Sequence, residues 1–169
     1  MSNTSPGLSI EKFEKTIPRL RHSIFKKISF ETLDGWYLVA EQLFVPGFGN
    51  LSGDELVHFE NGKISNQDGQ PSIIYYIREK SRYYSTYSIE YLKDNMMHRE
   101  DGPAKFYGVD LEFFKTHDKS FTVKINKAFY LDDRLKPYYL RDKGYDFAGF
   151  NRELKKNKLK DLIAQIDED

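Results

Sequence analysis

The sequence His98-Arg-Glu-Asp-Gly-Pro-Ala104 comes directly after a tight-turn signal at Asp94-Asn95 and a strand position at Met97. Asp and Asn tolerate the left-handed conformation that two-residue hairpin turns require. The stretch therefore predicts a hairpin whose second strand runs into a Gly-Pro corner and continues as the next strand. Aromatic-rich, alternating segments on both sides indicate that such hairpins make up most of the fold.

A weaker copy of this pattern lies 33 residues earlier. Both copies have a turn dipeptide, a strand position, an Asp-Gly pair and a proline, but the first has one extra residue and lacks the His-Arg pair. The matching positions are Asn61-Gly62 and Asp94-Asn95, Ser65-Asn66 and His98-Arg99, and Pro71 and Pro103, with Gln70 as the extra residue. A repeat of this size predicts one supersecondary unit that is used more than once.

The second copy resembles the short hairpin repeats with a His-Arg-x-Asp-Gly-Pro-Ala consensus, which are MORN-like variants in uncharacterised phage, bacterial and giant-virus proteins. The resemblance covers roughly residues 56–104. It implies a sheet of stacked hairpins and says almost nothing about activity. It also suggests a phage or mobile-element factor that binds a host protein and modulates it.

The composition favours one soluble, cytoplasmic protein with an aromatic core. The 169 residues include 13 Phe, 12 Tyr and one Trp, and 26 basic residues balance 26 acidic ones. A chain without net charge does not attract nucleic acid through its overall field. Without cysteine there are no disulfides and no thiolate ligands, and no apolar run is long enough to span a membrane. We expect no cofactor, no metal and no membrane association.

The predicted fold class is mainly β (α+β): an antiparallel meander of hairpin repeats with an N-terminal helical segment and a C-terminal amphipathic helix. Candidate turns also occur at Asn126-Lys127 and Asp132-Asp133. The predicted divisions are a disordered leader at 1–8 and a single domain at 9–169, in which 9–55 holds helix, strands and a mobile surface loop (46–53), 56–141 the meander, and 146–167 the C-terminal helix.

The C-terminal helix is predicted because the hydrophobic period changes from two to about 3.6 at Asn151. Its apolar positions are Leu154, Leu159, Leu162, Ile163 and Ile166, and its lysines, mostly on the other side, are Lys155, Lys156, Lys158 and Lys160. We expect the apolar side to pack against the sheet.

Four reactive groups stand together at His98, Arg99, Glu100 and Asp101. Strand alternation would place His98 and Glu100 on one face and Arg99 and Asp101 on the other, so the four would not converge on one site. Asp101-Gly102 before Pro103 is more simply a turn whose carboxylate caps backbone N–H groups. A hydrolase or nuclease with a dispersed site around His98 and Asp101 stays as an alternative.

Rings and bases interleave across one predicted hairpin, as a platform for single-stranded nucleic acid would require. The predicted binding residues are Tyr75, Tyr76, Arg78, Arg82, Tyr83, Tyr84 and Tyr87, together with His98 and Arg99. Exposed Tyr and Arg are also favoured anchors of protein interfaces. Both partners, protein and nucleic acid, therefore stay open for this hairpin.

Residues 28–62 contain six acids and no Lys or Arg, after a basic segment at 11–27. The six are Glu31, Asp34, Glu41, Asp54, Glu55 and Glu60. They predict either a solvated segment or an acidic face for a basic partner. Since the chain carries no Walker loop, no Gly-x-Ser-x-Gly and no calcium loop, we expect a small non-enzymatic binding protein that acts through protein–protein contacts.

Overall fold

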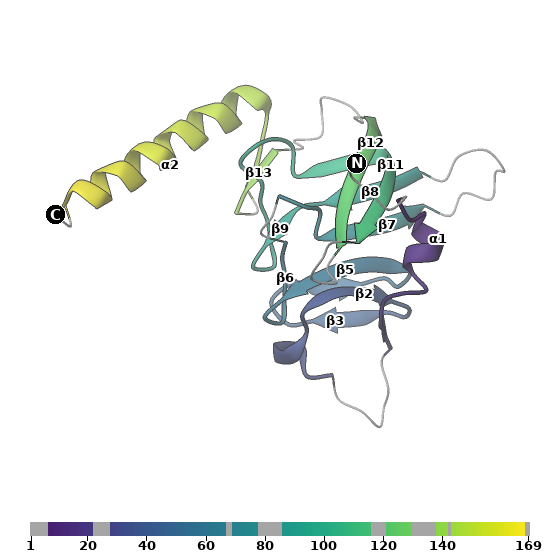
Figure 1. Cartoon of the computed structure of the whole chain (residues 1–169). Coiled ribbons are helices and arrows are strands. Elements are labelled where there is room, and N and C mark those ends of the chain that lie inside the picture. The colour runs from purple at the N-terminus through teal and green to yellow at the C-terminus, as the bar shows by residue number, and fades with distance from the viewer. Residues whose placement is uncertain are drawn as a thin grey trace, which may run out of the picture.

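The computed structural model describes residues 7–21, 28–66, 69–77, 86–115, 121–129, 138–141 and 143–167. Its largest part is an eight-stranded sheet, and its C-terminal helix stands apart (Figure 1). The sheet consists of β1 (Arg19–Leu20), β2 (Gly35–Val39), β5 (Glu55–Glu60), β6 (Lys63–Ile64), β7 (Ile73–Ile77), β8 (Thr86–Glu90), β11 (Lys105–Lys115) and β12 (Phe121–Phe129). Their order is β1-β2-β5-β7-β8-β11-β12, with β6 paired to β5.

Three two-stranded hairpins and three helical segments complete the described chain. The hairpins are β3 (Leu43–Val45) with β4 (Gly49–Leu51), β9 (Leu92–Lys93) with β10 (Met96–Met97), and β13 (Tyr138–Leu140) with β14 (Lys143–Tyr145). The helical segments are α1 (Ile10–Phe13), the 3-10 turn η1 (Phe30–Thr32) and α2 (Phe147–Asp167). The predicted mainly β fold of antiparallel hairpins with a C-terminal helix is confirmed.

The N-terminal helical segment is reduced to the single turn α1. Pro18 cannot continue a helix, and the chain next forms β1, which pairs in parallel with β2. Leu8, placed by the sequence in the leader, exchanges two backbone hydrogen bonds with Phe113, at 2.7 and 3.0 Å. The first six residues of that leader lie outside the described residues.

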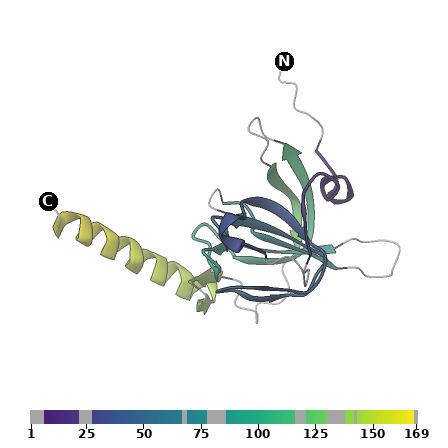
Figure 2. The same cartoon turned by 90° about the horizontal axis from the view of Figure 1, so that it is seen from below.

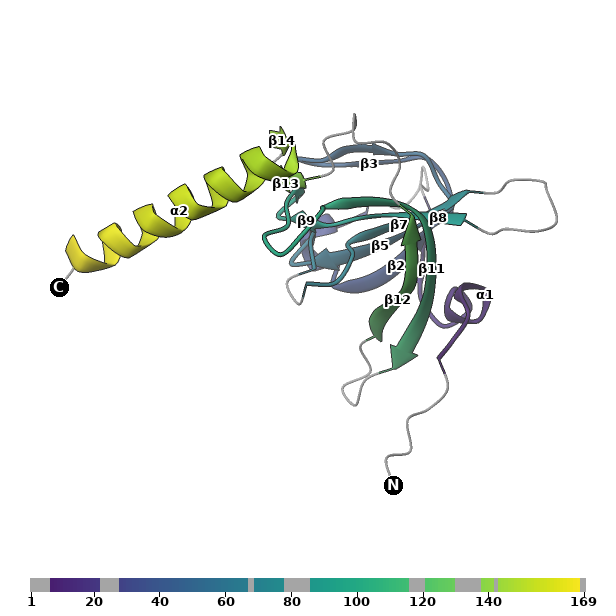
Figure 3. The same cartoon turned by 90° about the horizontal axis from the view of Figure 1, so that it is seen from above.

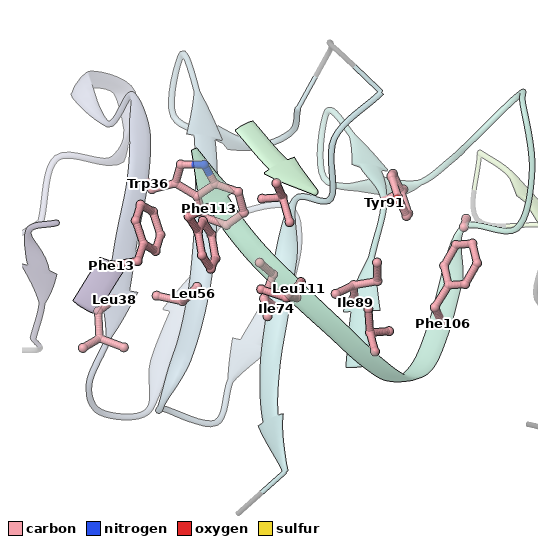
Figure 4. Close-up of a cluster of buried hydrophobic side chains, with 13 residues drawn as sticks. Phe13, Trp36, Leu38, Leu56, Ile74, Ile89, Tyr91, Phe106, Leu111 and Phe113 are labelled. Carbon is pink, nitrogen blue, oxygen red and sulfur yellow. The ribbon is translucent and has the colours of Figure 1, made fainter. Parts of the chain in front are cut away.

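One row of apolar side chains crosses the sheet from strand to strand. Its members, directly opposite one another in the register, are Leu38, Leu56, Ile74, Ile89 and Phe106. Phe13 of α1 and Phe113 of β11 join this row in the same buried cluster; their rings stack at 3.8 Å, and Trp36 meets both edge-on (Figure 4). This face therefore forms one aromatic-rich core.

The β3–β4 hairpin covers the opposite face of the sheet. Its Leu43, Val45 and Leu51 are buried with Val57 and Ile73 of the sheet in a second core. The prediction of a mobile surface loop at 46–53 is therefore wrong for its second half, because Gly49–Leu51 is β4 and Leu51 is only 1% exposed. The turn itself, around Gly47 with φ +79°, needs the conformational freedom of glycine.

The strands β11 and β12 are longer than the sequence predicts. The candidate turn at Asn126-Lys127 is wrong, since β12 runs through it and pairs Lys127 with Asp110 of β11. Asn126 is exposed, so its polar side chain marked a solvent-facing strand position. On the outer edge of β12, Val123 N–H donates to the Gln70 Oε1 oxygen at 2.6 Å. The extra residue of the first repeat thus caps a strand edge.

The helix α2 does not pack along the sheet as predicted. It points away from the sheets in three views (Figures 1, 2 and 3). It is anchored at its first turns, where Phe150 is buried and lies 5.1 Å from the Tyr138 ring. Asp146 caps the helix by accepting from Gly149 N–H at 2.7 Å.

Candidate functional site

The two sequence repeats are also repeats in three dimensions. Val57 pairs with Ile73 and Leu56 with Ile74 in the first copy; Glu90 pairs with Lys105 and Ile89 with Phe106 in the second. The offset is 33 residues on the first strand of each pair and 32 on the second, since Gln70 is extra. Each unit is therefore a strand, a short hairpin and a return strand, and in the sequence the Asp-Gly pair stands between the hairpin and the return strand.

Both turns adopt the left-handed conformation that their sequences predict. The φ angles are +50° and +77° at Asn61 and Gly62, and +53° and +68° at Asp94 and Asn95. The second turn stacks on the first hairpin: Asn95 N–H donates to Ile64 O at 2.9 Å, and Asn95 Oδ1 accepts from Ile64 N–H at 2.6 Å. The repeats are thereby joined through their turns.

Arg99 holds the second corner together. Its guanidinium lies 4.0 Å from the centre of the Tyr91 ring and donates to Asp101 Oδ1 at 2.6 Å and to the Pro103 carbonyl oxygen at 3.2 Å. The Asp101 carboxylate thus has a side-chain partner that the turn prediction did not include. A cation that stacks on a ring and bridges a carboxylate and a carbonyl fixes the path of the chain.

Asn66 takes the place of Arg99 in the first copy. Its Nδ2 donates to the Pro71 carbonyl oxygen at 3.2 Å, which is the bond that Arg99 makes to Pro103. The first copy lacks the His-Arg pair, but its shorter Asn66 side chain makes one of the hydrogen bonds that Arg99 makes in the second copy.

His98 links this corner to the β13–β14 turn. Its Nδ1 accepts from Arg141 N–H at 3.3 Å, and its Nε2 lies 3.4 Å from Glu100 Oε1. Nδ1 accepts this hydrogen bond only where it carries no proton, so the geometry assigns a ring proton to Nε2, which faces the Glu100 carboxylate. Because both nitrogens are engaged, His98 cannot act as a base or a metal ligand without breaking one contact.

Residues 98–101 do not form a strand. Their side chains nevertheless contact each other at a spacing of two residues, as the alternation of a strand predicted. His98 pairs with Glu100 and Arg99 with Asp101. The Arg99 guanidinium holds the pKa of the Asp101 carboxyl below its usual value. Burial raises the pKa of the Tyr91 hydroxyl, and the nearby Arg99 charge partly opposes this.

Three adjoining hollows meet at His98 and Glu100, which line all of them. The first, of about 390 Å³, extends to Asn66 and Gly69 of the first corner. The second, of about 460 Å³, extends to Leu154 and Asp161 of α2. The third, of about 350 Å³, includes Met96 and Arg141. We call this run of hollows the corner groove.

The predicted tyrosine and arginine platform is only partly described. Tyr75 is half-buried, and its hydroxyl donates to Glu90 Oε2 at 2.9 Å. Tyr76 and Tyr87 are opposite each other in β7 and β8. Arg78, Arg82, Tyr83 and Tyr84 lie outside the described residues.

The six predicted acids do not form one face. Glu41 lies next to Gly53, beside Asp54 and Glu55, whereas Glu31 lies against Gly62, close to Glu60, at the other end of β5. Asp34 belongs with the second group because it precedes Gly35, the partner of Phe59. Glu55 is 2% exposed, so it cannot present its charge to a partner as the acidic-face prediction requires. Its Oε1 accepts from Ser52 N–H at 3.0 Å, and its Oε2 is buried without a partner.

Sequence reasoning missed Asn66, Tyr91 and Arg141 as parts of this site. The repeat alignment could have indicated Asn66, because it occupies the position of Arg99. Nothing local in the sequence indicates Arg141, which reaches His98 from 43 residues away through the folded chain.

Within the described ranges, no three His, Asp or Glu side chains are grouped closely enough to hold a metal ion. No helix in this part of the chain combines the length and the apolar character that crossing a bilayer requires. In comparisons with known proteins, no family model, no curated protein and no solved structure matches the chain.

Proposed function

We propose that this protein is a non-enzymatic binding protein that acts through protein–protein contacts, and that a segment of its partner docks in the corner groove. The observation that carries the proposal is that three hollows, which stretch from the first repeat corner to α2, share His98 and Glu100. A site of this extent suits a polypeptide segment more than one small molecule. The resemblance to phage repeats makes a host protein the partner to seek first.

The walls of the groove support binding because they are held in place before a partner arrives. Arg99 is bound to Asp101 and Pro103, and His98 to Arg141 and Glu100. Side chains that are already fixed lose little conformational freedom when a complex forms. The same fixed contacts leave His98 without a free ring nitrogen, which favours binding over the alternative of acid–base chemistry.

The rim of the groove supports a protein partner because it combines both charges with an apolar group. Its exposed residues are Lys93, Asp94, Met96, Glu100 and Arg141. Alternating charges give register and specificity to an interface, and Met and Arg are enriched at interfaces. Met96 is 37% exposed although it is a large hydrophobic side chain.

The test is affinity capture from a host lysate with three forms of the folded protein. The groove variant is Glu100→Lys with Arg141→Glu, which keeps the net charge. The control is Glu41→Lys with Lys115→Glu, since both residues are exposed and neither lines the groove. We expect the wild type and the control to retain a stoichiometric partner and the groove variant to lose it.

Two results would contradict the proposal. Recovery of no stoichiometric partner by the folded wild type would argue against a binding function. Loss of the partner in the control, with retention in the groove variant, would move the interface to the acidic segment around Glu41. Circular dichroism of each variant confirms that the sheet is intact.

A further inference from the structure

The distal half of α2 projects away from the sheets, and its sequence carries an apolar stripe (Figures 1, 2 and 3). Leu159 is 58% exposed, and the helix continues past it, away from the sheets, to Asp167 (Figure 1). The spacing of Leu159, Leu162, Ile163 and Ile166 is the i, i+3, i+4, i+7 pattern of a helix that packs on another element.

This stripe is separate from the part of α2 that anchors the helix. Phe150 and Leu159 are nine residues apart, which is about two and a half turns, so they occupy opposite sides of the helix. Phe150 is 3% exposed and faces β13, whereas Leu159 is exposed to solvent. An amphipathic helix owes most of its stability in water to the packing of its apolar side. Packing against a second apolar surface would therefore stabilise the distal stripe.

We propose that the distal stripe of α2 pairs with the same stripe of a second copy of this chain, with the two helices antiparallel. The proposal concerns a surface distinct from the corner groove and does not depend on the proposed function. When Leu162 of one copy is level with Ile163 of the other, Leu159 is level with Ile166. The pairing is isologous, as a twofold dimer requires.

Charge along α2 selects the antiparallel arrangement. The first part of the helix has a basic excess, with Arg152, Lys155, Lys156, Lys158 and Lys160 against Glu153 and Asp161, and acids follow at Asp167, Glu168 and Asp169. Lys156 and Asp167 are eleven residues apart, about three full turns, and so lie on the same side of the helix. In the antiparallel pair, Asp167 of each copy lies within two residues of the level of Lys156 of the other. A parallel pair would place like charges together.

Lys156 is available for such a contact. Its side chain is 58% exposed, and its described ion pair is with Glu153 of the same helix at 3.7 Å. A pair of this kind at i, i+3 on an exposed helix is weak. Exchange for a partner across the dimer interface therefore costs little.

The test is sedimentation velocity of the full chain over a range of micromolar concentrations. We expect a reversible monomer–dimer equilibrium that Leu162→Gln and Leu159→Gln each weaken by at least about tenfold, since each removes two apolar side chains from a twofold interface. The control Gln165→Ala changes an exposed residue outside the stripe and leaves the equilibrium unchanged. Near-ultraviolet circular dichroism shows that the aromatic core stays folded in every variant.

Charge reversal tests the orientation. Lys156→Glu and Asp167→Lys each weaken the dimer, by about tenfold at low salt, because each replaces two attractions with two repulsions. The double variant Lys156→Glu/Asp167→Lys restores the dimer if the helices are antiparallel. Lys124→Glu, at an exposed position of β12, is the matched control. A wild type that stays monomeric, a dimer insensitive to Leu162→Gln, or a double variant that is not restored would each overturn the proposal.

Discussion

Asn66 and Arg99, which are 33 residues apart, donate equivalent hydrogen bonds of 3.2 Å to the carbonyl oxygens of Pro71 and Pro103. Each bond joins a residue shortly after a hairpin to a proline shortly before the return strand. The repeated element is thus a corner braced by a side-chain donor, and the two copies differ in how strongly it is braced. Arg99 adds a carboxylate and an aromatic ring to the contact.

We expect removal of the side-chain donor to lower the free energy of unfolding more at the second corner than at the first. Arg99→Ala should lower the free energy of unfolding by about 3 kcal/mol, because it removes the ring contact and leaves the Pro103 carbonyl oxygen without this donor. Asn66→Ala should cost about 1 kcal/mol, for one hydrogen bond. Urea unfolding measures both. Arg152→Ala, exposed on α2, is the control and should stay within about 0.5 kcal/mol of wild type.

Arg99→Lys refines this prediction. A lysine keeps the charge but cannot donate in a fork to Asp101 and Pro103 together. We expect a stability between those of the wild type and Arg99→Ala. Equal stability of Arg99→Lys and the wild type would show that charge alone braces the corner.

The Asp101 carboxyl makes stability depend on pH in a defined direction. Its pKa is lowered below the ordinary 3.8, mainly by the hydrogen bond from Arg99. The stabilisation is therefore present above about pH 3.8 and is lost as pH falls through the lower pKa of the folded state. Because the side chain is 69% exposed, Asp101→Asn should cost at most about 1 kcal/mol at neutral pH.

The difference in free energy of unfolding between the wild type and Asp101→Asn should shrink when unfolding is measured at pH values progressively below 3.8. The control Asp34→Asn removes an exposed carboxylate away from this corner and should leave the contribution of Asp101 unchanged. A difference between Asp101→Asn and the wild type that stays constant down to the lowest pH would mean that the carboxylate charge does not brace the corner.

The features that the sequence predicts well are local. Asn61-Gly62 and Asp94-Asn95 form tight turns because few residues adopt positive φ angles readily, and these do. The helix predicted at 146–167 is observed at Phe147–Asp167, since its period and its Asp146 cap are contained in adjacent residues. The offset repeat predicted one supersecondary unit used more than once, and the structure adds that the two units share their strand register.

The features that the sequence does not predict depend on long-range packing. The sequence around Gly49–Leu51 is rich in glycine and resembles a loop. In the folded chain this segment pairs with β3 as a strand, and Leu51 is buried in the second core. Glu55 has the sequence character of a surface acid, but in the folded chain it is buried and accepts a hydrogen bond from Ser52 N–H. The direction of α2 is likewise undetermined by its own periodicity, because it carries two apolar sides.

The first turn offers a sharp test of backbone geometry. Gly62 has φ +77°, and a Cβ atom there would lie 2.3 Å from the Phe30 carbonyl oxygen. Gly62→Ala should therefore lower the free energy of unfolding by at least about 3 kcal/mol, from strain and collision together. Gly69→Ala is the matched control: its φ is +68°, but a Cβ atom would meet nothing within 4 Å.

For Gly69→Ala we expect only the cost of the left-handed conformation, about 1 kcal/mol. Thermal unfolding followed by circular dichroism separates the two variants. Equal losses would show that the conformation alone matters and that the approach of η1 to the turn contributes nothing.

The repeat also predicts how to replace an ion pair whose carboxylate is buried. Glu90 and Lys105 occupy the positions that Val57 and Ile73 occupy in the first copy. Glu90 is 5% exposed, and its carboxylate is paired with Lys105 Nζ and accepts from the Tyr75 hydroxyl. Lys105→Ile alone should cost about 3 kcal/mol, because it leaves a buried carboxylate without its cation.

The double variant Glu90→Val/Lys105→Ile installs the apolar pair of the first copy in the same register. We expect a stability within about 1 kcal/mol of wild type, since a well-packed apolar pair can replace a buried ion pair without loss. A double-mutant cycle in urea measures the coupling. Additive losses would mean that the second core has no room for branched apolar side chains at this position. Recovery in the double variant would show that the two repeats share their packing as well as their register, and that the ion pair is not needed to specify the sheet.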